Sequence, residues 1–274
     1  MAVVAIGQQI GSNGLGLGRL VAAQLQYPLL TSEEIAAQVA HEYHVTAEQL
    51  ALVDEREPRF WERLGTDSAR LVAYFCAVVM KHMASCQVVI VGRSIPLIVP
   101  PQTRHGLRIR TVAPFSVRVG QVMRDEKLGT AAAERRVRHY DLEVRARTQN
   151  TLGADLEDPS LYDWIINTAT CPLLWFASSI AEFAVTIERE ADADSKQALS
   201  DGCLTAQVRA ALMAHPKIGH APVTVKTQAG KVVLKSASLV PPWDSLATSV
   251  VQQVPEVLGV QVEIEEAPGP IRVV

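Results

Sequence analysis

Short apolar runs, rich in β-branched residues, alternate with longer segments of helical periodicity along the first two thirds of the chain. The apolar runs lie at residues 3–6, 29–30, 88–91, 107–112 and 164–166. The helical segments lie at residues 19–25, 31–44, 46–53, 58–84, 115–126, 131–148 and 172–188. Continuous apolar runs are typical of strands that are buried on both faces. Strands that alternate with helices therefore predict an α/β fold with a parallel sheet.

The pattern changes after residue 188. Residues 189–200 are mostly charged or small, which is typical of a linker. The segments that follow predict a helix at 204–214, a strand hairpin at 223–226 and 232–234, a helix at 243–254 and a strand at 260–265. We therefore expect a first domain over residues 1–188 and a small α+β module of αββαβ order over residues 201–274.

Composition and charge exclude several classes of protein. The 274 residues include 26 Lys and Arg against 29 Asp and Glu, a net charge of −3, whereas dedicated nucleic-acid binders usually have a basic excess. The longest apolar run, 71–80, is too short to span a membrane, and residues 1–6 are expected to form a strand rather than a signal peptide. Four cysteines without a C-x-x-C pair are typical of buried thiols in a reducing compartment. We expect a cytoplasmic protein.

A glycine-rich turn, Gly11-Ser12-Asn13-Gly14, separates the first expected strand from the first expected helix. In that context the backbone N–H groups of the turn and of the helix start form an anion site. The strict phosphate-loop pattern G-x-x-x-x-G-K-[ST] is absent, because no lysine lies near the turn. The turn therefore indicates phosphate binding without the usual cation.

Two other interpretations of this turn stay open. Gly14-x-Gly16, with Glu34 twenty residues after Gly14, is close to a dinucleotide-binding pattern. Arg19, however, stands where a third glycine is expected, and Glu34 opens a helix instead of ending a strand. The turn is also compatible with a strand-to-helix connection that holds no ligand.

Four sequence motifs occur in a characteristic order. They are I-G-Q-Q-I-G-S-N-G-L-G-L-G-R-L-V-A at 6–22 with Y-P at 27–28 and E-I at 34–35, V-I-V-G-R-S at 89–94, L-R-I-R-T-V-A-P-F-S-V-R-V-G-Q-V-M at 107–123, and D-P-S-L-Y-D-W-I-I-N-T at 158–168. Together they resemble the cytidylate kinase-like family over about residues 2–188. The resemblance implies a nucleoside-monophosphate-kinase-like phosphate-loop fold. It also implies that the chain uses ATP and Mg²⁺ to phosphorylate CMP or another nucleoside monophosphate.

The resemblance also implies which residues act. Those expected to bind phosphate or nucleotide are Gly11, Ser12, Asn13, Gly14, Arg93 and Arg136. Those expected to act in phosphoryl transfer are Arg118, Asp141 and Arg145. Guanidinium groups match phosphate oxygens and are always charged, and Arg145 follows Asp141 by four residues, which places both on one helix face. Acidic residues are interleaved with these arginines, so a salt-bridged surface helix remains an alternative. No metal-ligating set is expected, because the seven histidines have no supported metal spacing.

Residues 201–266 resemble a BON domain. The matching segments are L-T-A-Q-V-R-A-A-L at 204–212, P-V-T-V-K at 222–226, G-K-V-V-L at 230–234 and L-G-V-Q-V-E-I at 258–264. The resemblance implies attachment to a protein or a phospholipid surface, although the lysines of this module also fit a solvated face. Because the turn lacks a lysine, a second hypothesis is a catalytically weak or inactive nucleotide sensor or adaptor that acts through this module.

Overall fold

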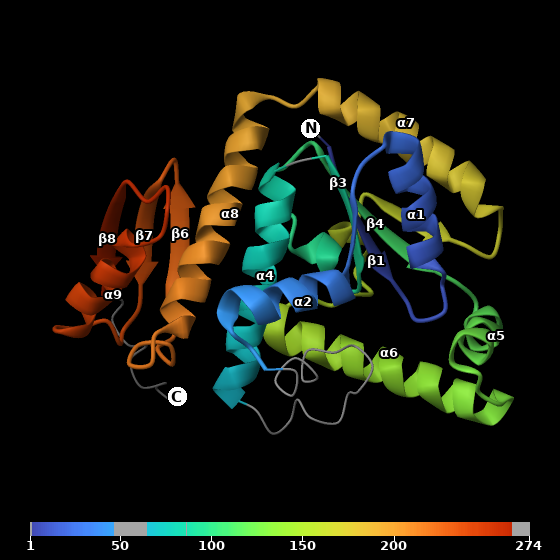
Figure 1. Cartoon of the computed structure of the whole chain (residues 1–274), viewed down its shortest axis with the longest axis horizontal. Coiled ribbons are helices and arrows are strands. Elements are labelled where there is room, and N and C mark those ends of the chain that lie inside the picture. Colours follow the sequence, from blue (N-terminus) through green and yellow to red (C-terminus); the bar gives the residue numbers. More distant parts are fainter. Residues whose placement is uncertain (1, 47–64, 86, 265–274) are drawn as a thin grey trace, which may run out of the picture.

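A computed structural model of the chain describes residues 2–46, 65–85 and 87–264 (Figure 1). The helix expected at 46–53 lies almost wholly outside the described residues, and so does the first part of the helix expected at 58–84. Within the described part, no helix is long and apolar enough to cross a membrane.

A five-stranded sheet lies at the centre of the first part of the chain. Its strands are β1 (Val3–Gln8), β2 (Leu29–Thr31), β3 (Val88–Gly92), β4 (Gly106–Val112) and β5 (Trp164–Asn167). They lie in the order β2-β3-β1-β4-β5, and every neighbouring pair is parallel. The expected parallel α/β fold is therefore confirmed. Its central strand, β1, is the strand that leads into the glycine-rich turn.

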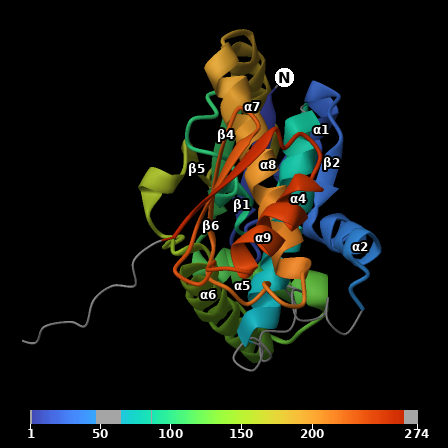
Figure 2. The same cartoon turned by 90° about the vertical axis from the view of Figure 1, so that its left-hand side faces the viewer.

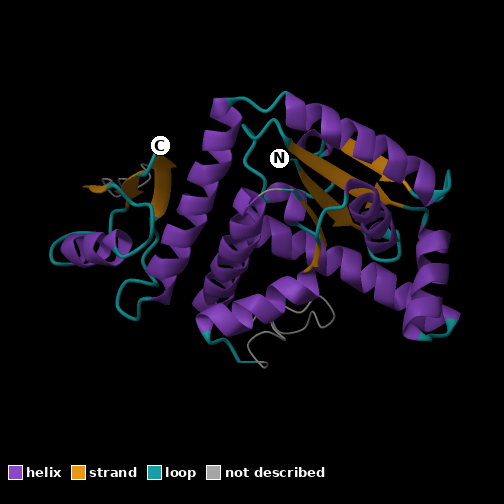
Figure 3. Ribbon diagram, turned by 45° about the horizontal axis from the view of Figure 1, so that its top comes forward, coloured by secondary structure: helices purple, strands orange, loops and turns teal. Residues whose placement is uncertain are grey.

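Helices cover both faces of this sheet (Figure 3). On one face lie α1 (Gly14–Leu25) and α7 (Leu173–Arg189), and on the other lie α2 (Ser32–Tyr43) and α4 (Gly65–Ser85). The side chains of β1 alternate between the two cores. Val4 and Ile6 pack with α1 and α7, and Val3 and Ala5 pack with α2 and α4. Burial on both faces explains why β1 is a continuous apolar run.

The second helix begins as its sequence indicates. Thr31 Oγ1 accepts a hydrogen bond from the N–H of Glu34 at 3.3 Å, and Glu34 Oε2 accepts one from the N–H of Thr31 at 2.8 Å. This reciprocal capping box satisfies two N–H groups at the helix start that no helical carbonyl can reach. The helix predicted to begin at the hydroxyl-acid segment 31–34 is confirmed.

Two further helices lie beyond the carboxyl end of β4. They are α5 (Phe115–Glu126) and α6 (Thr130–Leu152), which share a small core formed by Val119, Val122, Ala133 and Val137. Short 3-10 turns precede β4 and β5, namely η2 (Ile95–Leu97) and η3 (Pro159–Leu161). Figure 1 shows α6 crossing below the sheet. The arginine-rich helix therefore lies at the carboxyl end of β1, where Gly7 and Gln8 line a cavity together with residues of α6.

A second, three-stranded sheet forms the C-terminal module (Figure 2). β6 (Thr224–Gln228) and β7 (Lys231–Lys235) form an antiparallel hairpin, and β8 (Gly259–Glu263) is parallel to β7. The second half of α8 (Ala193–Ala214) and the helix α9 (Trp243–Gln252) pack against this sheet and enclose a core of their own. The expected αββαβ order is present.

The start of α8 differs from expectation. The helix was predicted to begin at residue 204 after a linker, but it begins at Ala193, so residues 193–200 are helical. Leu199 and Cys203 are buried in the core that α4 and the first sheet share. Packing on α4 stabilises a segment that has few large apolar residues of its own. In Figure 1 the helix α8 stands between α4 and the small sheet, and it contributes to the cores on both sides.

Candidate phosphate-binding site

The glycine-rich loop runs from the end of β1 to the start of α1. Gly11 has a φ of 74°, and a Cβ at this position would lie 2.5 Å from the carbonyl oxygen of Arg118. A Cβ on Gly14 would lie 2.7 Å from Thr111 Oγ1. Asn13 has a φ of 57°, a left-handed conformation that asparagine adopts more readily than most residues. Backbone conformation and close packing therefore explain the residue types in this turn.

The side chain of Ser12 points into the protein. It is fully buried, its hydroxyl donates to the carbonyl of Gln9 at 2.8 Å, and its Oγ lies 2.8 Å from Thr111 Oγ1. The hydroxyl of Thr168 donates to the carbonyl of Ser12 at 2.7 Å. These bonds hold the loop against β4 and the end of β5. The side chain of Ser12 therefore stabilises the loop from its buried side, and its hydroxyl is not exposed to a ligand.

The start of α1 is capped by a residue of β1. Gln8 Oε1 accepts a hydrogen bond from the N–H of Leu15 at 3.0 Å, whereas Asn13, at the N-cap position, makes no side-chain capping bond. The N-terminus of a helix carries partial positive charge and N–H groups without helical partners, which is why anions bind there. Gln8 thus places a neutral oxygen where a phosphate oxygen is expected.

Arg118, one of the predicted catalytic residues, is 7% exposed and bonded to another of them. Its two terminal nitrogens donate to Asp141 Oδ1 and Oδ2, both at 2.9 Å, and its Nε donates to the carbonyl of Ala113 at 3.2 Å. A bidentate ion pair of this kind is strong and fixed in direction. It holds α5 and α6 together next to the loop.

Arg93 lies at the end of β3 and is also 7% exposed. The carbon at the centre of its guanidinium lies 3.7 Å from the centroid of the Tyr140 ring, so the two groups are stacked. A cation over an aromatic face is stabilised by the ring quadrupole, and more so where water is excluded. The stack fixes the position of a charged group at the carboxyl end of the central strands.

A small cavity of about 40 Å³ lies between the loop and α6. Its lining residues are Gly7, Gln8, Gln9, Arg93, Arg110, Tyr140, Asp141, Val144, Arg145, Leu156, Glu157 and Tyr162. Three arginines converge on this one space: Arg93 directly follows β3, Arg110 lies in β4 and Arg145 lies in α6. Three of the predicted residues, Arg93, Asp141 and Arg145, therefore lie around a single cavity beside the loop.

The other arginines of this cavity also have partners. Arg110 donates to the hydroxyl of Tyr162 at 3.1 Å and pairs with Glu157, and burial raises the pKa of the Tyr162 hydroxyl. Arg145 donates to Asp155 at 2.7 Å. The N–H of Glu157 and the Arg145 guanidinium hold the pKa of Asp155 below its usual range. Each of these two positive charges is thus balanced at short range.

Arg136, also predicted to bind phosphate, lies outside the cavity. Its Nε donates to Glu126 at 3.2 Å, and its guanidinium carbon lies 5.4 Å from the centroid of the Tyr140 ring. It pairs with an acid of α5, which is the arrangement that the salt-bridged alternative described. Its nearest link to the cavity runs through the Tyr140 ring.

Sequence reasoning missed Gln8, Arg110, Tyr140 and Tyr162. One signal was present, because Arg110 interrupts the apolar run of β4, and a charge on a buried strand needs a partner. Tyr162 and Gln8 lie within the matched segments 158–168 and 6–22, but their roles depend on the packing of the cavity and on the path of the loop. Tyr140 gave no signal, since aromatic residues are frequent in helices of any function.

The described side chains fit phosphate better than Mg²⁺. No group of three or more His, Cys, Asp and Glu able to hold a metal ion occurs in the part of the chain that the structure describes. The hydroxyl of Ser12 is fully buried, and Asp141 is bonded to Arg118 through both oxygens. Mg²⁺ in phosphotransfer sites usually takes one or two carboxylates in addition to phosphate oxygens. The two carboxylates that line the cavity, Asp141 and Glu157, are paired with Arg118 and Arg110, so one of these pairs would have to open for either carboxylate to bind Mg²⁺.

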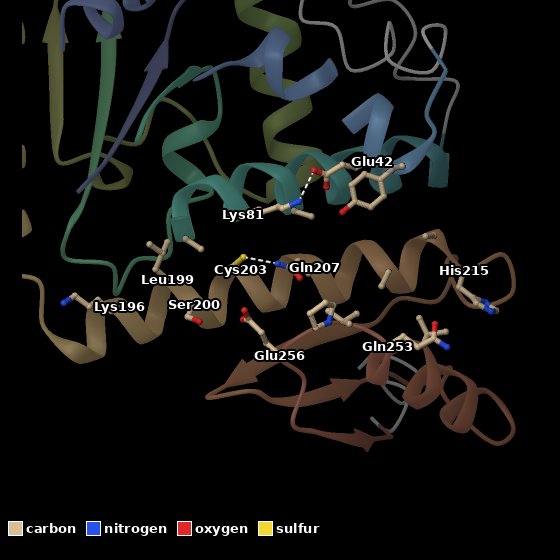
Figure 4. Close-up of a pocket in the computed structure, with 18 of the residues that line it drawn as sticks. Glu42, Lys81, Lys196, Leu199, Ser200, Cys203, Gln207, His215, Gln253 and Glu256 are labelled. Atoms are coloured by element: carbon tan, nitrogen blue, oxygen red, sulfur yellow. Dashed lines mark hydrogen bonds and ion pairs between the residues drawn. The ribbon is translucent and has the colours of Figure 1, made fainter. Parts of the chain in front are cut away.

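A much larger cavity than the one beside the loop lies along α8 (Figure 4). It measures about 1020 Å³, and its walls come from α2, α4, α8 and the segment after α9. Lys81 pairs with Glu42 at 3.0 Å, and burial raises the pKa of the Cys203 thiol, which is therefore protonated at neutral pH. Size alone does not make this cavity the reactive site. We place the candidate site at the loop, where the anion-binding geometry is.

A central β1, a glycine-rich loop into α1 and the sheet order β2-β3-β1-β4-β5 define a phosphate-loop kinase-like α/β fold. Comparison with family models identifies the family within that class. The model of the cytidylate kinase-like family matches residues 3–170, more than half of the chain, and the chain belongs to that family. No curated protein matches the chain in sequence.

Similar folds occur among solved structures. An uncharacterised protein from Eubacterium ventriosum has a TM-score of 0.52 at 15% identity, covering 68% of this chain and 99% of that one. Shikimate kinase from Acinetobacter baumannii, in complex with shikimate, has a TM-score of 0.41 at 14% identity, covering 68% and 94%. A gluconokinase from Sinorhizobium meliloti has a TM-score of 0.37 at 13% identity, covering 69% and 93%. At 15% identity the likeness to the first of these structures concerns the fold alone.

Proposed function

We propose that the chain binds nucleoside phosphates at the loop between β1 and α1 and transfers the γ-phosphoryl group of ATP to a nucleoside monophosphate such as CMP. The observation that carries the proposal is the convergence of Arg93, Arg110 and Arg145 on one cavity beside this loop. In parallel α/β sheets, ligands bind beyond the carboxyl ends of the strands, which is where these side chains lie.

Phosphoryl transfer depends mainly on the positioning of the two substrates and on neutralisation of their charge. An oxygen of the acceptor phosphate forms a bond to the γ-phosphorus, the bond from that phosphorus to the β–γ bridging oxygen breaks, and ADP leaves. The acceptor phosphate carries a charge near −2 at neutral pH, so its attacking oxygen needs no base. In this proposal the loop holds the phosphates of ATP, and Arg93 and Arg145 hold the acceptor. Arg118 and Asp141 position α6 over both.

The cavity must open to admit a substrate. It measures about 40 Å³, whereas pockets for molecules of nucleotide size measure several hundred Å³. The contacts that close it are the pairs Arg145–Asp155 and Arg118–Asp141, both formed by α6. We propose that α6 moves away from the loop when the acceptor enters and returns over it before transfer.

Titration calorimetry with ATP, ADP and a panel of nucleoside monophosphates tests the binding step, and coupled detection of ADP tests transfer. We expect binding of ATP and of at least one monophosphate, and ADP release that depends on that monophosphate. Each titration is run with and without Mg²⁺, since the carboxylates that line the cavity are already paired with arginines. If ATP and the monophosphates all fail to bind at millimolar concentration, the proposal is wrong.

A second candidate function is a nucleotide sensor with little or no transferase activity. It is favoured by a specific observation: Leu15 N–H, which a phosphate-loop ligand is expected to use, already has the oxygen of Gln8 as its partner. In this version occupancy of the loop alters the C-terminal module, residues 201–266, through α8, and that BON-like module contacts a protein or a phospholipid surface in the cytoplasm. Brisk ADP production with any monophosphate would eliminate this candidate.

A further inference from the structure

The side chain of Gln8 occupies the N-terminal end of α1. Its Oε1 lies 3.0 Å from the N–H of Leu15. The packing around it is close, since a Cβ on Gly14 would lie 2.7 Å from Gln8 Cβ and 2.9 Å from Gln8 Oε1. Asn13, which stands at the N-cap position, makes no side-chain capping bond. The cap of this helix is therefore supplied by a residue of the preceding strand.

A phosphate at the loop needs the same N–H group. Helix N-termini bind anions because their N–H groups point at the ligand and the helix dipole favours negative charge. A neutral amide oxygen is a weaker acceptor than a charged phosphate oxygen, so a phosphate can displace it. The displacement requires the bond between Gln8 and Leu15 to break first.

We propose that Gln8 is an internal competitor of the phosphate ligand, and that nucleotide binding turns its amide away from α1 into the adjoining cavity. Gln8 borders that cavity together with Arg93 and Arg145. The displaced amide therefore enters the space that we assign to the acceptor, and the two halves of the site become coupled. This inference rests on the proposed nucleotide binding and adds the residue that sets its affinity.

The test compares Gln8→Met with Gln24→Met. Methionine keeps the Cβ contact and the length of the side chain at residue 8 but removes the amide oxygen. Gln24 lies near the other end of α1, where its exposed side chain donates to Ser178 at 3.2 Å, and this distance from the loop makes it a matched control. By calorimetry, Gln8→Met binds ATP and inorganic pyrophosphate about three- to tenfold more tightly than the wild type. Its melting temperature without ligand is lower, because the cap is lost.

Gln8→Glu gives the opposite result. A carboxylate at the same place caps α1 more strongly and repels phosphate, so we expect a higher melting temperature without ligand and roughly tenfold weaker binding of ATP. Gln24→Met resembles the wild type in both measurements. NMR of ¹⁵N-labelled protein adds a direct readout, in which pyrophosphate shifts the side-chain amide resonances of Gln8.

The outcomes separate this inference from the proposed function. One outcome disproves the competition and leaves nucleotide binding standing. In it, the wild type and Gln8→Met bind ATP equally well, and pyrophosphate does not shift the Gln8 resonances of the wild type. If neither the wild type nor any variant binds ATP or pyrophosphate, both proposals fail. Binding by Gln8→Met alone supports the competition in its strongest form.

Discussion

The guanidinium of Arg118 and the carboxylate of Asp141 form two parallel hydrogen bonds of 2.9 Å between helices that share only a small core. Arg118 is almost fully buried, whereas the side chain of Asp141 is 37% exposed. Replacing the arginine leaves the aspartate in contact with water, but replacing the aspartate leaves the buried guanidinium of Arg118 without its counter-charge. The two single substitutions are therefore not equivalent.

We expect Asp141→Asn to lower the free energy of unfolding by about 2–4 kcal/mol and Arg118→Met by about 1–2 kcal/mol, since an uncompensated buried charge costs more than a half-exposed one. Urea denaturation measures both. Arg124→Met, an exposed position on the same helix, serves as control and should change stability by less than about 0.5 kcal/mol. Equal losses for all three variants would show that the pair does not hold α5 to α6.

The stack of Arg93 on Tyr140 predicts an effect on binding. Tyr140→Leu removes the ring and leaves the guanidinium without its support, so the affinity for the nucleoside monophosphate should fall by about three- to thirtyfold. Arg93→Ala should reduce it further, because the phosphate loses its cation. Calorimetry with the monophosphate identified in the panel measures both, and Leu142→Ala, an exposed position on α6, is the control. Unchanged affinity in Arg93→Ala would remove this residue from the site.

The loop conformation predicts that Gly11 tolerates no side chain. An alanine there would combine a φ of 74° with a Cβ 2.5 Å from the carbonyl oxygen of Arg118, so the loop must shift. We expect Gly11→Ala to lower the free energy of unfolding by more than about 2 kcal/mol and to weaken phosphate binding. Gly129→Ala is the matched control, since a Cβ there meets nothing within 4 Å. Comparable melting temperatures for the two variants would contradict the geometry.

Local patterns were sufficient to predict most of the first sheet, because its central strands are buried on both faces and are therefore continuous apolar runs. The cap of α2 at Thr31 could also be predicted from local sequence, since both partners lie within four residues. The start of α8 could not be predicted in this way. Its first turns are charged and small, and Leu199 becomes a core residue only because α4 lies beside it. Tertiary packing on α4 determines where α8 begins, and a local sequence pattern carries no information about such packing.

The site divides in the same way. The turn that contains Gly11 and Gly14 follows from the chain order of strand, glycines and helix, so sequence located it. The partners of the arginines did not follow, because Arg118 and Asp141 are 23 residues apart and meet only when α5 and α6 pack. Spacing placed Asp141 and Arg145 on one helix face, but it could not name their partners, which are Arg118 and Asp155. Pairwise charge contacts between elements depend on the tertiary fold.

The last prediction concerns the attachment of α8 to the first sheet. His105 is fully buried, and its Nδ1 lies 2.6 Å from Ser195 Oγ in the first turn of α8. Ser195 Oγ also accepts the N–H of Arg104 at 2.8 Å. Ser195→Ala leaves these two buried groups without that partner and should lower the free energy of unfolding by about 1–3 kcal/mol.

The same contact gives a pH dependence. Burial lowers the pKa of His105 below its usual value of 6.5; the N-terminal amine and Lys196 add to the shift, and Asp192 and Glu188 oppose it. The unfolded chain therefore binds a proton at this histidine at a higher pH than the folded chain does. The stability that His105 contributes is fully present above about pH 6.5 and is lost as the pH falls from there towards the lowered folded value. Urea denaturation between pH 7.5 and 5.5, roughly one unit to either side of the usual histidine pKa, should show this loss in the wild type and much less of it in His105→Gln. His41→Gln, on the exposed face of α2, should keep the wild-type slope. Parallel slopes for all three proteins would mean that His105 is not the group responsible.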